Sequence, residues 1–296
     1  MDLDIILDVN VARLAHAGWE LELERLVMGG PTSTALHIHA NCDLGRWIYA
    51  RGLHKYGKFS EIWELKKAHK SFHAIAEDIM RLKIEGHDNL VLEMLEEMRR
   101  LSRDVIYLLT SLELSVTHQK QQDPVLVQAW NLLAEFFGGD AESQLFPMYL
   151  DQEKLPWYAF NKKRLSHLNS MLDINAARLN HVIWVRNLEI AFSRLNRKKS
   201  LPDADKCSLG LWIHSLGQQE FLGEEEFADL VKTHKKFHDL SQMTLTALHR
   251  QDFQAADHAY EKVQMESRKL VSQLTHLELQ MQNSKTSAQR MKSILL

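Results

Sequence analysis

Long tracts of this sequence place apolar residues at positions i, i+3, i+4 and i+7, the spacing that gives an amphipathic helix one buried face. Glycine and proline, which interrupt helices, are scarce, with 12 and 5 residues in the chain. In the first part of the chain the pattern predicts four helices, over about residues 4–28, 34–51, 59–84 and 89–118, with a turn near Gly52 to Gly57 after the second. Four antiparallel helices with short connections make a bundle.

The second part of the chain shows the same succession of apolar tracts. Here the pattern predicts helices over about residues 157–197, 206–216, 224–248 and 251–283. The polar residues from 284 onward are expected to fray.

The two sets of helices carry the same three motifs in the same order: H-x-x-W, C-x-L-G-x-W and H-x-x-x-H. Each motif residue of the second set lies 165 positions after its equivalent in the first, as His181 does after His16. A constant offset over all three motifs, with no insertion between them, does not arise by chance. The chain therefore contains two copies of one unit of roughly a hundred residues, which is the size of a small domain.

These observations predict an all-α fold with two tandem four-helix bundles joined by a helical linker. The first bundle is assigned to residues 1–118 and the second to residues 169–285. The linker is assigned to residues 119–168 and a polar tail to residues 286–296.

Composition and charge exclude several classes of partner. A net charge of −3 offers no basic face for nucleic acid, so we expect no nucleic-acid partner. The N-terminus is acidic and no apolar run approaches the length of about 20 residues that spans a bilayer, so we expect a cytoplasmic protein with no membrane partner. The only two cysteines, Cys42 and Cys207, are equivalent residues of the two copies, which indicates equivalent chemical roles rather than a disulfide framework.

The H-x-x-x-H motif places two imidazoles on one face of a helix, about 6 Å apart along the axis, where both can bind one ion. A thiolate from another helix and a third imidazole complete the four ligands of a closed zinc site. Sulfur and imidazole nitrogen suit Zn²⁺ and do not suit Mg²⁺ or Ca²⁺. The sequence therefore predicts two His₃Cys sites and two Zn²⁺ per chain. The predicted ligands are His16, Cys42, His69 and His73 in the first copy and His181, Cys207, His234 and His238 in the second.

The motifs and their spacing resemble the chemoreceptor zinc-binding (CZB) domain, found in bacterial soluble chemoreceptors and in zinc-regulated diguanylate cyclases. The resemblance covers about residues 8–118 and 173–283. It implies the same eight ligands, and a four-helix bundle, often dimeric, that senses zinc or hypochlorous acid through the zinc-bound cysteine. A closed site leaves no position for a substrate, so we expect no catalytic residues and no enzymatic activity.

The chain differs from the usual arrangement in two respects. It carries two such units, which can pair with each other as a pseudo-dimer. It also has no recognisable output module, so we expect a signalling partner from chemotaxis or cyclic-di-GMP pathways, or a homodimer.

Two other functions compete with that of a zinc or redox sensor. In the first, the chain is a helical interaction protein in which zinc has only a structural role. A hemerythrin-like di-iron protein is also a His-rich four-helix bundle, but di-iron sites need repeated carboxylates. Glu20 and Glu77 lie near the ligands of the first copy, but Gln242 stands at the position of Glu77 in the second, so the carboxylates do not repeat as the histidines and cysteines do.

Overall fold

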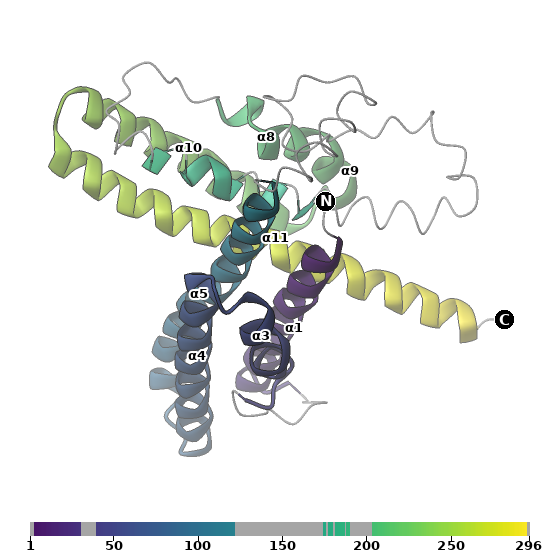
Figure 1. The fold of residues 1–296 in the computed structure, drawn as a ribbon. Coiled ribbons are helices and arrows are strands. Elements are labelled where there is room, and N and C mark those ends of the chain that lie inside the picture. Colours follow the sequence, from purple (N-terminus) through teal and green to yellow (C-terminus); the bar gives the residue numbers. More distant parts are fainter. Residues whose placement is uncertain are drawn as a thin grey trace.

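A computed structural model shows the chain as an assembly of helices, and the described residues include no strand (Figure 1). The structure describes residues 3–30, 40–121, 174–175, 177–179, 181–186, 188–189 and 203–294. The all-α prediction is confirmed for these residues. Beyond Gln121 the predicted linker lies outside the described residues. Both ends of the helix predicted over residues 157–197 also lie outside them.

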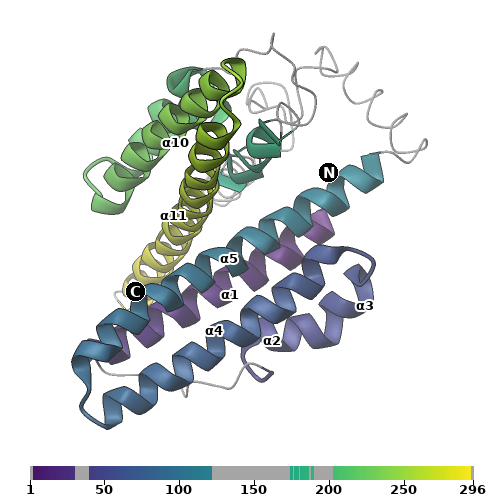
Figure 2. The ribbon, with the colours of Figure 1, turned by 90° about the vertical axis from the view of Figure 1, so that its left-hand side faces the viewer.

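Three long helices form the frame of the first bundle. They are α1 (Leu3–Val27), α4 (Ser60–Ile84) and α5 (Asp88–Gln121), and each lies close to its predicted bounds. Figure 2 shows them side by side, with the shorter helices against α4 and α1. The frame holds because each helix turns an apolar face inward. Its core includes Leu65, Phe72, Ile79 and Leu109, all fully buried.

The fourth element of this bundle differs from its prediction of 34–51. Its described helical part runs through α2 (Asp43–Trp47), a π-helical turn η1 (Ile48–Gly52) and α3 (Leu53–Tyr56). The helix begins at Asp43 because the Cys42 thiol caps it, and it passes through Gly52, where a turn was predicted. Gly52 has helical dihedral angles, and a Cβ there would lie 3.1 Å from Ile62 and Trp47 side-chain atoms. This glycine therefore permits close packing rather than a turn.

The second bundle repeats these elements. Residues 174–189 are helical wherever they are described. The remaining elements are η3 (Ala204–Lys206), α8 (Ser208–Trp212), η4 (Ile213–Gly217), α9 (Gln218–Phe221), α10 (Glu225–His249) and α11 (Phe253–Ile294). Helix α11 extends eleven residues past its predicted end at 283, through a segment without glycine or proline.

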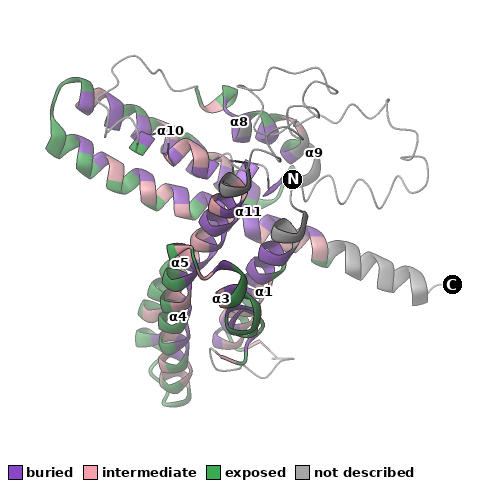
Figure 3. Ribbon diagram, viewed as in Figure 1, coloured by how far each residue is buried: buried purple, intermediate pink, exposed green. Residues whose placement is uncertain are grey.

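The two bundles meet where α11 crosses α1 and α5 (Figures 1 and 2). Figure 3 shows buried residues along all three helices at this crossing. An apolar cluster joins the bundles there, made of Ala17, Ile106, Leu114, Leu179, Val182 and Val271. None of the described helices combines the length and apolar character that crossing a membrane requires.

A buried polar network also crosses this contact. Arg13 donates to Glu113 at 2.6 Å within its own bundle, and Glu113 accepts from Asn175 of the other bundle at 2.7 Å. The equivalent residues mirror this arrangement: Arg178 donates to Glu278 at 2.5 Å, and Glu278 accepts from Asn10 at 2.6 Å. Both ion pairs are fully buried, so each charge depends on its partners rather than on water.

Two candidate metal centres

The first candidate centre joins α2 to α4. Cys42 precedes α2, where its Sγ accepts the backbone N–H of Gly45 at 3.2 Å. The same Sγ lies 3.2 Å from His69 Nε2, and His73 follows one helical turn later with its ring centroid 4.7 Å from that of His69. One ligand atom from each of the three residues lies within 4.8 Å of the others, and all three side chains are buried. Three residues in this arrangement could hold a metal ion.

The second centre reproduces the first. Cys207 Sγ accepts from Gly210 N–H at 3.3 Å and lies 3.2 Å from His234 Nε2. The His234 and His238 ring centroids are 4.8 Å apart, and these three residues again bring their ligand atoms within 4.8 Å. Here His238 is only half-buried.

The third predicted histidine of each set lies beside its group but outside the 4.8 Å cluster. The His16 ring centroid is 6.2 Å from that of His69, and its Nε2 is 3.1 Å from Ser102 Oγ on α5. His181 Nε2 is likewise 3.0 Å from Ser267 Oγ on α11. The structure thus brings together three of the four predicted ligands at each centre and places the fourth next to them.

Aromatic side chains separate the centres from the rest of the core. Phe72 is fully buried, with its ring centroid 4.6 Å from that of His16, and the centroid of Trp19 is 4.6 Å from that of His73. In the second centre the same positions hold Phe237, 4.3 Å from His181, and Trp184, 5.2 Å from His238. These aromatic residues therefore pack directly around the candidate ligands.

Burial sets the protonation of the candidate ligands. It lowers the pKa of His16 and of His181 well below 6.5, and the neighbouring histidines lower it further. The pKa of His234 falls to about 3 for the same two reasons. Burial raises the pKa of the Cys42 and Cys207 thiols above 9.0, against the opposing effect of their backbone hydrogen bonds. Without metal, His16, His181 and His234 are therefore neutral and the two thiols are protonated near pH 7.

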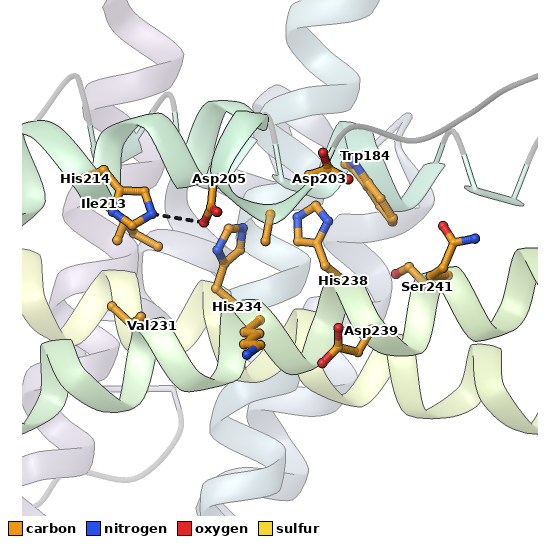
Figure 4. A pocket seen from close by; sticks show the side chains of 13 residues that line it. Trp184, Asp203, Asp205, Ile213, His214, Val231, His234, His238, Asp239 and Ser241 are labelled. Atoms are coloured by element: carbon orange, nitrogen blue, oxygen red, sulfur yellow. Dashed lines mark hydrogen bonds and ion pairs between the residues drawn. The ribbon is translucent and has the colours of Figure 1, made fainter.

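A cavity of about 380 Å³ reaches the second centre (Figure 4). Trp184, His234 and His238 line it together with Asp205. The Oδ1 atom of Asp205 lies 3.1 Å from His214 Nε2. The backbone passes close to Gly210, beside the cysteine, where a Cβ would lie 1.8 Å from the carbonyl oxygen of Ala204.

The donor atoms fit a zinc ion. Each group offers one sulfur and two imidazole nitrogens from two different helices, a set that suits zinc and lacks the oxygen ligands that Mg²⁺ and Ca²⁺ need. Sequence reasoning missed Ser102 and Ser267, although their offset of 165 positions on otherwise apolar helix faces is a detectable signal.

Comparison with protein families identifies the repeated unit. Residues 16–80 and 181–244 each match the family described as the chemoreceptor zinc-binding domain, and each match contains all four predicted ligands of its copy. Comparisons with curated proteins and with solved structures found no significant match. The repeated order of motifs, the two Cys–His–His groups and the two family matches agree, and the chain therefore carries two chemoreceptor zinc-binding domains in tandem.

Proposed function

We propose that this chain is a sensory protein of bacterial signal transduction in which each domain holds one zinc ion. The observation that carries the proposal is that each domain brings a buried thiol within 4.8 Å of two imidazoles that lie on another helix. His16 and His181 are the fourth ligands in this proposal, because each is buried beside its group. When bound, zinc acts as a Lewis acid that holds the sulfur as a thiolate.

The helices that carry the ligands explain how a ligand change would alter the bundle. Cys42 lies at the start of α2, while His69 and His73 lie on α4, so the centre ties a short helical element to the long frame. Structural zinc sites contribute apparent binding free energies of about 10–16 kcal/mol, which are coupled to folding. Release of Cys42 would free α2 and change the surface that the bundle presents to a partner.

The signal in this proposal is either zinc availability or an oxidant. Hypochlorous acid converts a cysteine thiolate to a sulfenic acid and releases chloride, so the sulfur loses two electrons and gains the hydroxyl group. A sulfenic acid is a weaker ligand than a thiolate, and its formation would loosen the centre. Four protein ligands leave no position for a substrate, so we propose no enzymatic activity.

The output in this proposal passes through another protein, a component of chemotaxis or cyclic-di-GMP signalling, or through a second copy of the chain. We also propose that the two domains pair within one chain. The buried network between Arg13, Glu113 and Asn175, with its mirror image, supports this pairing.

Metal content tests the proposal directly. The purified protein should contain about two zinc ions per chain, and the double variant Cys42→Ala, Cys207→Ala should lose most of them while keeping its helicity by circular dichroism. Hypochlorous acid should release zinc from the unmodified protein. Retention of both ions under oxidant and chelator would indicate a purely structural zinc, and about four iron atoms per chain would favour a di-iron protein instead.

A further inference from the structure

The first centre has a buried carboxylate that the second centre lacks. Glu20, only 3% exposed, lies on α1 one turn after His16. Ser102 donates its hydroxyl proton to Glu20 Oε2 at 2.5 Å, and the same Ser102 oxygen lies 3.1 Å from His16 Nε2. A buried chain of hydrogen bonds thus leads from His16 through Ser102 to Glu20.

The direction of this chain fixes the tautomer of His16. An ionised carboxylate only accepts hydrogen bonds, so Ser102 must donate to Glu20 and accept from His16. His16 therefore carries its proton on Nε2 and keeps the lone pair on Nδ1. Histidines that bind metals commonly donate their second N–H to such a partner, which orients the ring and strengthens the metal-binding nitrogen.

The second bundle contributes to the same chain. His276 on α11 places its Nε2 3.4 Å from Glu20 Oε2, and this histidine is also close to Glu24 and Glu226. Glu24 accepts from Arg99 at 2.6 Å, so its charge has a partner of its own. Glu20 consequently lies between the ligand shell of the first centre and a helix of the other domain.

The equivalent positions around the second centre carry different groups. Ser267 keeps the contact with His181 at 3.0 Å, but Val185 occupies the place of Glu20 and Ser111 that of His276. Ser267 instead interacts with the phenol of Tyr107, which comes from the first bundle. A phenol can donate or accept, so it does not impose one tautomer on His181 as the carboxylate imposes one on His16.

Carboxylates do lie near the second centre, in the wall of its cavity. Asp203, Asp205 and Asp239 belong to this wall, and all three are exposed. Water screens exposed charges, whereas a buried carboxylate acts through a low local dielectric. Glu20 is therefore the stronger influence on a cation bound next to it.

We propose that Glu20 is a positioning residue for the first metal centre, and that it makes the two centres bind zinc with unequal affinity, the first more tightly. This inference rests on the proposed zinc binding. Acting through Ser102, Glu20 holds His16 in the tautomer that can join the ligand set, and its negative charge offsets part of the charge of the ion. Removal of a partner of this kind typically lowers metal affinity about 10–100-fold.

The test uses the full chain with one centre inactivated at a time. Cys207→Ala leaves the first centre for measurement, and Cys42→Ala leaves the second. Competition with a chromophoric zinc chelator gives the affinity of each. We expect the first centre to bind about 10–100-fold more tightly than the second. Within the Cys207→Ala protein, Glu20→Gln and Ser102→Ala should each lower zinc affinity by a similar factor.

Glu24→Gln is the matched control, because Glu24 lies one turn further along α1 and pairs with Arg99 rather than with Ser102. Its zinc affinity should match that of the Cys207→Ala protein. Thermal unfolding of the metal-free variants separates an effect on folding from an effect on the site. The Co²⁺-loaded protein gives a second measurement: its visible absorption bands should change in Glu20→Gln and not in Glu24→Gln.

Each outcome distinguishes the inference from the proposed function. If the Cys207→Ala protein binds zinc and Glu20→Gln changes neither the affinity nor the Co²⁺ spectrum, the role of Glu20 is refuted and zinc binding stands. Equal affinities of the two centres would also overturn the inference. If neither single-centre protein binds zinc, the proposed function itself fails.

Discussion

Removal of Glu113 should destabilise the protein strongly, because this residue is central to the contact between the two bundles. It accepts from Arg13 at 2.6 Å and from Asn175 at 2.7 Å, and neither Arg13 nor Glu113 has any exposed surface. Burial, followed by the nearby Arg178, lowers the pKa of Arg13 from 12.5 to about 10. Arg13 therefore remains charged at pH 7 and needs a counter-charge.

The Glu113→Ala substitution leaves this guanidinium buried with only neutral partners, the amide oxygens of Asn10 and Asn175. Breaking a buried pair by removing one partner costs about 3–5 kcal/mol, a large part of the roughly 5–15 kcal/mol that stabilises a typical domain. Glu278→Ala should have a similar effect, since Glu278 pairs with Arg178 in the mirror-image position at 2.5 Å.

Urea unfolding of the metal-free full chain, followed by circular dichroism, measures this loss. Asp43→Ala is the control, because its ion pair with Arg46 is about two-thirds exposed on both sides and should contribute less than about 1 kcal/mol. The double variant Arg13→Met, Glu113→Met should recover much of the loss, since it removes the unpaired charge. A Glu113→Ala protein as stable as Asp43→Ala would refute the view that this network holds the bundles together.

Three further predictions follow from the two centres. The Cys42 and Cys207 thiols are protonated, and His16, His181 and His234 are neutral, so each zinc should release about one proton and its affinity should rise about tenfold per pH unit between roughly pH 6 and 8. Calorimetry in buffers of different ionisation enthalpy measures this release, and two protons per ion would contradict it. Because the pKa of His16 is lowered in the folded protein, the unfolded chain binds a proton at this histidine more readily. The metal-free protein should therefore keep its full stability above about pH 6.5 and lose up to about 1.4 kcal/mol per pH unit below it. Urea unfolding at several pH values measures this loss. Gly210→Ala should weaken zinc binding at the second centre, since the added Cβ collides with backbone, whereas Gly18→Ala, with open space around it, should not; equal chelator competition by the two variants would oppose this.

The long helices could be predicted from the sequence because apolar periodicity is a local signal. The helix predicted at 59–84 is observed at Ser60–Ile84. The element near Cys42 could not be bounded in the same way, because its start depends on a thiol cap and its passage through Gly52 depends on packing against Ile62. Glycine is a turn signal in sequence, and only the fold shows when it is a packing residue.

The metal-binding groups were predictable for a related reason. The spacing of His69 and His73 is fixed by one helical turn, and the second copy repeats it. The hydrogen bond from Ser102 to Glu20 joins residues 82 positions apart, and its approach to His276 requires the two bundles to be docked. Contacts of this kind arise from helix packing, which the sequence pattern of a single helix does not specify.

The mirror-image network between the bundles has a consequence for how this protein can evolve. In an assembly of two identical chains, every substitution near the symmetry axis is introduced twice and must be tolerated in both places. Here the two halves are encoded separately, so one can change while the other keeps its residue. Glu20 facing Ser102, with Val185 at the corresponding place, is such a divergence. Two copies within one chain thus allow one half to specialise while Arg13, Arg178 and their carboxylates preserve the shared contact.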